Sequence, residues 1–171
     1  MLLLFILITI TNGKILPKYY DLVLQRCSQN STKWDGNCHG LPWTIFGIFS
    51  MQDWGVSIPN YWYNDTYNGT VLSHIKPIES ELDKYWFGCG ECGGNCSFVN
   101  PAAWWGVWNN YGICSNWSIL EYFKNGLVMF NIASRFNFYN CCHNQIQYCH
   151  LPYNKDLMSL GCYWPGGNEL H

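Results

Sequence analysis

The sequence predicts a single domain of the α+β class. A chain of 171 residues is long enough to bury one hydrophobic core. Two segments have the composition of β-strands and two others carry the end signals of helices, but strands and helices do not alternate regularly. This arrangement favours α+β over a doubly wound α/β fold. No linker, repeat or low-complexity tract divides the chain after its first 13 residues, so one domain is expected over residues 14–171.

Strands are predicted in the first third of the chain. Tyr20–Leu24 reads as one strand, and Trp43–Phe49 is rich in the β-branched and aromatic residues that favour extended backbone. The following segment, Met51–Thr70, contains a proline and a glycine and is expected to be a loop. Gly88–Cys96 is rich in glycine and cysteine and is interpreted as a cross-linked loop.

Two helices are predicted in the second half. Asn100 and Pro101 have the residue types of an N-cap and a first helical position, and Gly112 is the expected stop of that helix after Tyr111. The second helix follows a capping box that starts at Ser118 and is completed by its glutamate three residues later. Its apolar residues recur at helical spacing on one face: Ile119, Tyr122, Phe123, Leu127 and Phe130.

The start of the chain predicts secretion. Residues 1–10 form an apolar run that is too short for a membrane span, and residues 1–13 together fit a signal peptide. No second run is long enough for a membrane anchor, so an extracellular protein without a membrane partner is expected. Glycosylation sequons begin at Asn30, Asn64, Asn68, Asn95 and Asn116.

The cysteines point in the same direction. An even, high count of 10 behind a signal peptide predicts a disulfide framework. The spacing of Cys89, Cys92 and Cys96 also resembles a zinc site, but disulfides are the stronger interpretation in a secreted chain, and no metal or cofactor is expected. The cysteines are Cys27, Cys38, Cys89, Cys92, Cys96, Cys114, Cys141, Cys142, Cys149 and Cys162.

Charge and aromatic content limit the partners. The net charge is −2 and only 12% of residues are charged, with no cluster of lysine and arginine. A protein that grips a phosphate backbone through charge usually carries such a cluster, and no DNA partner is expected. The 10 tryptophans and 12 tyrosines can supply stacking surfaces for single-stranded nucleic acid, although most aromatic residues are expected in the core.

Two segments carry a family resemblance. Trp43–Ser50 resembles the first signature of the T2-type ribonucleases, F-T-I-H-G-L-W-P, and matches it at Thr44, Ile45 and Gly47. The segment from Trp104 to Cys114 resembles the second signature, W-E-H-E-W-x-K-H-G-T-C. Its matches are Trp104, Trp108, Gly112 and Cys114, at identical spacing.

The resemblance extends over nearly all of residues 14–171 and implies an antiparallel central sheet packed by helices, stapled by disulfides. It also implies pairings of Cys27 with Cys38, Cys149 with Cys162, and Cys114 with one of the three cysteines in the glycine-rich loop. Cys141 and Cys142 are then left to pair elsewhere.

The residues that cut RNA in this family are replaced here. The signature histidines, glutamate and lysine fall at Phe46, Gly106, Val107, Asn110 and Tyr111. Cleavage needs one group to take the 2′ proton and another to protonate the leaving 5′ oxygen, which imidazole does near neutral pH. Phenylalanine, glycine and valine exchange no proton, and a tyrosine with a pKa of roughly 10 is a poor base. An inactive ribonuclease site lined by these five residues is therefore predicted.

Three functions remain open at this point. The favoured one is a non-catalytic protein that binds RNA or an extracellular protein, with Trp43, Phe46, Tyr61 and Tyr111 as candidate contacts. The second is an active endoribonuclease with relocated catalysts drawn from the remaining histidines, which are otherwise expected in surface loops. The third is a secreted module that binds glycans or proteins. The histidines are His39, His74, His143, His150 and His171.

Overall fold

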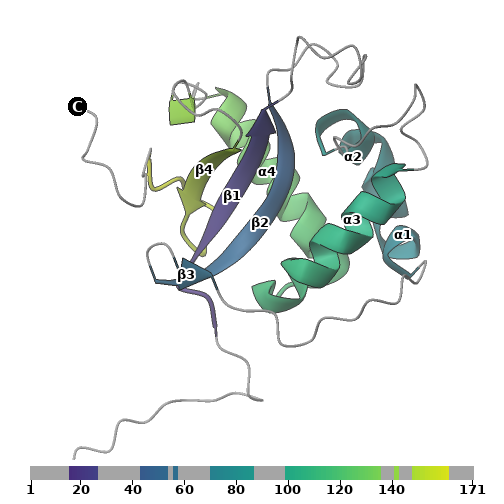
Figure 1. Ribbon diagram of the computed structural model, residues 1–171, viewed down its shortest axis with the longest axis horizontal. Coiled ribbons are helices and arrows are strands. Elements are labelled where there is room, and N and C mark those ends of the chain that lie inside the picture. The colour runs from purple at the N-terminus through teal and green to yellow at the C-terminus, as the bar shows by residue number, and fades with distance from the viewer. Residues whose placement is uncertain are drawn as a thin grey trace, which may run out of the picture.

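The structure, a computed structural model, describes residues 16–26, 43–53, 56–57, 70–86, 99–135, 141–142 and 148–161. These residues form an α+β domain, as predicted (Figure 1). In chain order the elements are β1 (Tyr19–Arg26), β2 (Trp43–Asp53), β3 (Val56–Ser57), α1 (Thr70–Ile75), the 3-10 helix η1 (Lys76–Ile78), α2 (Glu79–Tyr85), α3 (Val99–Asn110), the 3-10 helix η3 (Gly112–Ser115), α4 (Ile119–Arg135) and β4 (Tyr148–Tyr153).

The sheet is antiparallel and has the strand order β3-β2-β1-β4. β1 is the inner strand that links the two longest pairings, and Leu22 lies opposite Ile48 of β2 and Leu151 of β4. The strands predicted at 20–24 and 43–49 are both confirmed. β4 contains a proline and lies at the edge of the sheet, where a proline is tolerated. The expected loop at Met51–Thr70 is wrong at its start, because β2 continues to Asp53 and β3 pairs with it.

The two faces of the sheet have different roles. The face that carries Leu22, Ile48 and Leu151 packs against α4, which crosses behind the sheet in Figure 1, and this interface is the hydrophobic core. Because side chains alternate along a strand, the intervening residues of the same strands point to the opposite side. This second side, called the outer face below, carries Asp21 and Val23 and their cross-strand neighbours.

α4 begins where its sequence predicts. The Ser118 backbone N–H donates to Glu121 Oε2 at 2.8 Å, and the Glu121 N–H donates to Ser118 Oγ at 3.3 Å, which completes the capping box. These bonds lower the pKa of the Glu121 carboxyl. The predicted apolar face is confirmed, with Tyr122, Phe123, Leu127 and Phe130 buried.

The predicted helix α3 is confirmed to within two residues at each end, but its end signals work differently from the prediction. It begins at Val99, so Asn100 lies inside the first turn and not at the N-cap position, and its Nδ2 donates to Asp83 Oδ1 at 2.8 Å. Its last residue is Asn110, and Gly112 does not have the left-handed backbone of a glycine stop. Gly112 opens η3 instead, with its Cα against the indole of Trp108. α1 and α2 were not predicted, because each is shorter than two full periods of a helical pattern.

Tyr122 joins α4 to the sheet. Its hydroxyl donates to the Ile48 carbonyl at 3.1 Å and accepts from the Ile48 N–H at 2.9 Å. β3 pairs with β2 only at Met51 and Asp53, so the edge of β2 at Ile48 has no strand beside it among the described residues. The tyrosine hydroxyl takes the place of that strand. Burial raises the pKa of Tyr122 far above its ordinary value, so it stays protonated.

The described disulfide corrects one expected pairing. Cys142 is bonded to Cys149 of β4, with their Cα atoms 5.3 Å apart. The predicted Cys149–Cys162 bond is therefore wrong, because a cysteine forms only one disulfide. Cys141 is also disulfide-bonded. The other cysteines of the expected pairs, apart from Cys114 in η3, lie outside the described residues, as does the predicted signal peptide.

Across the described ranges, no helix has the length and apolar content needed to cross a bilayer.

Substituting Gly112 should test the close contact with Trp108. A Cβ at position 112 would overlap the Trp108 indole, so Gly112→Ala should lower the free energy of unfolding by about 1–3 kcal/mol, the usual cost of overpacking. Gly106→Ala is the matched control, because a Cβ there meets nothing within 4 Å. The control should stabilise α3 by roughly 0.5–1 kcal/mol. Denaturant unfolding measures both, and equal effects of the two variants would contradict this packing.

Candidate functional site

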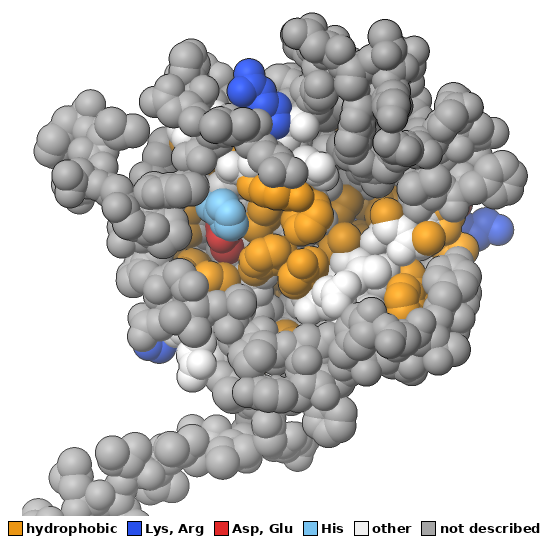
Figure 2. All heavy atoms as spheres, in the orientation of Figure 1, with side chains coloured by type: hydrophobic (Ala, Val, Ile, Leu, Met, Phe, Trp, Pro, Cys, Tyr) orange, Lys and Arg blue, Asp and Glu red, His pale blue; other side chains and the backbone are white. Residues whose placement is uncertain are grey.

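The candidate site is the outer face of the sheet, next to the C-terminal end of α3. Four half-buried aromatic residues meet there and are called the aromatic face: Phe46 and Phe49 of β2, Tyr111 after α3, and Tyr148 of β4. Figure 2 shows hydrophobic side chains gathered over these strands, with a histidine and an acidic side chain beside them.

A β-bulge places Phe46 on this face. Val23 lies opposite Gly47 and Leu24 lies opposite Ile45, so Phe46 is the extra residue that β1 leaves without a partner. Bulges turn side chains away from regular alternation and are common beside functional sites. The Phe46 carbonyl accepts from the Trp86 indole N–H at 3.3 Å, which holds the bulge against the core.

The aromatic rings contact one another. Phe49 and Tyr111 are stacked with ring centroids 4.2 Å apart, and the edge of Phe46 meets Tyr148 at 5.1 Å. Gly47 lies beside this contact, since a Cβ there would be in ordinary van der Waals contact with the Val107 side chain at 3.4 Å and with Tyr111 at 3.5 Å. Burial, and then the neighbouring Tyr148, raise the pKa of Tyr111. Tyr111 is therefore a neutral hydrogen-bond donor and not a base.

The structure brings together some of the residues predicted for this site and separates others. Phe46, Val107 and Tyr111 lie together, as predicted. Asn110 is exposed and donates from Nδ2 to the Gly106 carbonyl at 2.8 Å, and a Cβ on the half-buried Gly106 would meet nothing within 4 Å. Val107 has no ionisable group and Tyr111 keeps its proton, so the described face lacks the acid–base pair of the ribonuclease signatures.

Trp43 does not fit its prediction as a ligand contact. It is only 5% exposed and belongs to the core, with the Arg26 guanidinium 6.0 Å from its ring. Tyr61, the other predicted aromatic contact, lies outside the described residues. Of the sequon asparagines only Asn116 is described, and it is exposed and has a left-handed backbone with φ of 65°.

His150 is the site residue that sequence reasoning placed in a surface loop. It lies in β4 opposite Val23 of β1, on the outer face, and its ring edge meets Phe49 at 6.5 Å. Its Nδ1 is 2.6 Å from Oδ2 of Asp21, a buried carboxylate of β1. Alternation along a strand could have predicted from the sequence that Tyr148, His150 and Pro152 share one face. It could not have predicted that His150 lies beside Asp21, because this depends on how β4 pairs with β1.

The Asp21–His150 pair sets the charge of this region. The hydrogen bond and the negative charge of Asp21 raise the pKa of His150, although burial of the ring opposes this. The second carboxylate oxygen, Asp21 Oδ1, is buried with no hydrogen-bond partner among the described residues, so His150 is the group that compensates the carboxylate there. Within the described ranges no cluster of three or more metal-ligating side chains occurs.

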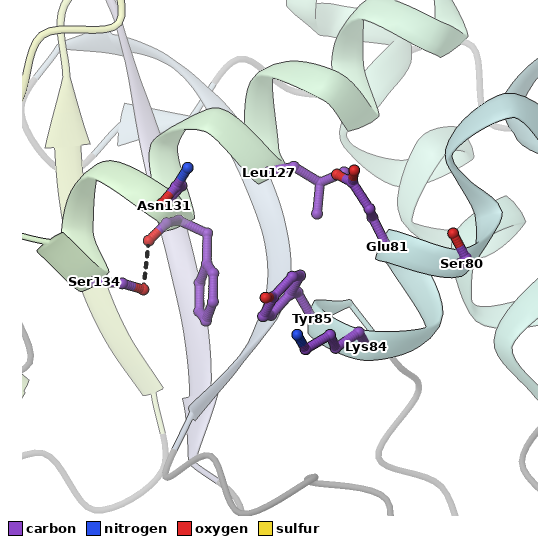
Figure 3. Close-up of a pocket in the computed structure, with 8 residues that line it drawn as sticks. Ser80, Glu81, Lys84, Tyr85, Leu127, Asn131 and Ser134 are labelled. Atoms are coloured by element: carbon purple, nitrogen blue, oxygen red, sulfur yellow. Dashed lines mark hydrogen bonds between the residues drawn. The ribbon is translucent and has the colours of Figure 1, made fainter.

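A separate pocket lies on the helical side of the sheet. It has a volume of about 660 Å³ and opens between α2 and α4 (Figure 3). Its walls combine apolar side chains such as Leu127 and Phe130 with Glu81 and Lys84. Ser134 Oγ donates to the Phe130 carbonyl at 2.8 Å, within the helix itself. The pocket contains none of the residues that the signatures single out.

The Asp21–His150 pair should make stability depend on pH. Because the pKa of His150 is raised in the folded state, the pair stabilises the fold fully below the ordinary histidine pKa of about 6.5 and loses this effect as pH rises through the raised value. Asp21→Asn should therefore lower the free energy of unfolding by about 2 kcal/mol at mildly acidic pH and by less at alkaline pH. Denaturant unfolding across pH measures this. An Asp21→Asn deficit that stays constant with pH, or one matched by the exposed His74→Gln control, would contradict the assignment.

Comparison with known proteins places the fold. No protein-family model and no curated protein sequence matches the chain. Among solved structures, it is similar to trichomaglin, described as a novel S-like ribonuclease, with a TM-score of 0.58 and 17% identity over 86% of this chain and 92% of that one.

Two further structures give the same result. The RNase-related protein from Calystegia sepium has a TM-score of 0.59 and 15% identity over 92% of this chain and 95% of its own. RNase NT, solved in complex with 5'-AMP, has a TM-score of 0.59 and 15% identity over 89% of this chain and 94% of its own. This chain therefore has the fold of the T2-type ribonucleases, as its two signature segments predicted.

Proposed function

We propose that this protein binds single-stranded RNA on the aromatic face and does not cut it there. The observation that carries the proposal is the make-up of the face: Phe46, Phe49, Tyr111 and Tyr148 contact one another where the signatures would supply acid–base groups. Aromatic rings bind unpaired bases by stacking, which needs no basic patch and is tolerant of sequence. The nucleotide bound in the RNase NT structure supports a ligand of this class on this fold.

The same face argues against cleavage by the family's mechanism. Taking and returning a proton requires two groups that change protonation near the working pH. Phe46 and Val107 have none, and the raised pKa of Tyr111 keeps its proton in place. Each missing acid–base group typically costs a factor of about 10²–10⁴ in rate, so their joint loss removes useful activity.

The test combines an RNA-cleavage assay with a binding assay. The purified protein should leave single-stranded RNA intact from acid to neutral pH but retain a labelled oligonucleotide. Tyr111→Ala should weaken this binding about tenfold, within the range of one lost stacking contact. The affinity should fall only gently with salt, because few phosphates are neutralised.

Tyr85→Ala is the matched control, because Tyr85 is a half-buried tyrosine of α2 that lines the separate helical pocket. It should bind RNA like the unmodified chain. Cleavage that disappears in His150→Gln would overturn the non-catalytic assignment in favour of relocated catalysts. No RNA retention at low salt, together with binding to a protein or glycan array, would overturn RNA as the ligand.

We also propose that the protein acts outside the cell. Residues 1–13 fit a signal peptide, and the Cys142–Cys149 bond fits an oxidising compartment. Expression in eukaryotic cells should release the chain into the medium with a new N-terminus near Lys14. Treatment with an N-glycosidase should lower its mass, and Asn116→Gln should remove part of that difference. Retention of an uncleaved, unglycosylated chain inside the cells would contradict this proposal.

A further inference from the structure

His150 gives the aromatic face a polar edge of a kind that the rest of the face lacks. The half-buried ring meets Phe49 nearly perpendicularly, at an interplanar angle of 78°, with centroids 6.5 Å apart. Phe49 is in turn stacked on Tyr111. An ionisable imidazole thus stands at one end of a row of aromatic rings, on the outer face of the sheet.

We propose that His150, held by Asp21, is a phosphate-binding site, so that the aromatic face takes a nucleotide unit with its base against the rings and its phosphate on the imidazole. This inference deepens the RNA-binding function proposed above and rests on it for the base. The phosphate contact itself depends only on the His150–Asp21 pair.

The orientation of the pair favours an anion. Asp21 Oδ2 is hydrogen-bonded to Nδ1 of His150, and this bond fixes the orientation of the imidazole ring. The other ring nitrogen, Nε2, is therefore on the edge of the ring that is turned away from the carboxylate. The His150 side chain is 30% exposed, whereas that of Asp21 is only 9% exposed. An approaching phosphate therefore meets the imidazole first, and the carboxylate lies behind it.

The charge of the neighbours is also suitable. Among the described residues, those around His150 are Asp21 from β1, Phe49 from β2, and Tyr148 two residues away on its own strand, with Tyr111 beyond Phe49. Asp21 is the acidic residue of this described set, and its hydrogen bond and charge raise the pKa of His150. A protonated imidazole donates a charge-assisted hydrogen bond to a phosphate oxygen.

The spacing fits one nucleotide unit. A base and its own phosphate are joined through a single ribose, and the 6.5 Å between the Phe49 and His150 rings is comparable with that span. A single imidazole cannot both take the 2′ proton and protonate the leaving oxygen, so the arrangement predicts binding without cleavage.

The experiment uses three probes on the full chain: inorganic phosphate, adenosine and 5'-AMP. At mildly acidic pH the chain should bind 5'-AMP about tenfold more tightly than adenosine in calorimetry, since a hydrogen bond to a charged group is worth about that factor. His150→Gln should bind both equally, whereas His74→Gln should keep the preference. The preference should fade as pH rises through the raised pKa of His150, and at a lower pH in Asp21→Asn.

The histidine ring resonances give a second measurement that does not need the base. Inorganic phosphate should shift the His150 resonance, identified by its loss in a folded His150→Gln variant, and leave that of His74 in place. If phosphate shifts His150 but adenosine does not bind, the phosphate site stands and the stacking function fails. If adenosine binds, but phosphate leaves the His150 resonance unmoved and His150→Gln keeps the 5'-AMP preference, the phosphate site is overturned and the stacking function stands.

Discussion

The rest of the structure depends on the two hydrogen bonds between Tyr122 and the backbone of Ile48. β2 extends past the short strand β3, and buried N–H and C=O groups at its edge need partners. The Tyr122 hydroxyl supplies both and fixes α4 against the sheet at one point. Trp86 and Trp108 pack around the same phenol ring, so the joint is also the centre of the aromatic core. The joint holds α4 against β2, while the pairing of β2 with β1 and its bulge set the direction of the side chains on the outer face.

The core explains which parts of the ribonuclease signatures are present. Trp104 is 1% exposed and donates from its indole N–H to the Trp86 carbonyl, and Trp108 and Gly112 are in contact with each other. These matching residues point inward and hold α3 in place. The replaced positions Phe46 and Tyr111 lie on the outer face, where a change of side chain leaves the core intact. The residues that hold the fold and the positions of the family's acid–base groups are therefore physically separate, so the fold does not depend on which side chains stand at Phe46 and Tyr111.

The proposed RNA site on the outer face depends on two kinds of interaction. In that proposal the aromatic face supplies ring surface for bases, and the Asp21–His150 pair supplies one protonated group beside it. A chain with a net charge of −2 gains little from long-range attraction to phosphates. In the proposal, the local positive charge is instead the His150 imidazole, whose pKa the buried Asp21 carboxylate raises.

Local pattern was sufficient for much of the fold. The strand at Trp43–Phe49 and the capped helix after Ser118 were predictable because each depends on residues close in sequence. The sequence alone also places Phe46 and Tyr111 at the positions where the family signatures have histidines. Only the tertiary structure decided that Trp43 is buried, that Cys149 pairs with Cys142, and that His150 meets an aspartate 129 residues away. The physical reason is that alternation along a strand assigns each side chain to a face, but its partners on that face depend on strand order and register, which distant segments determine together.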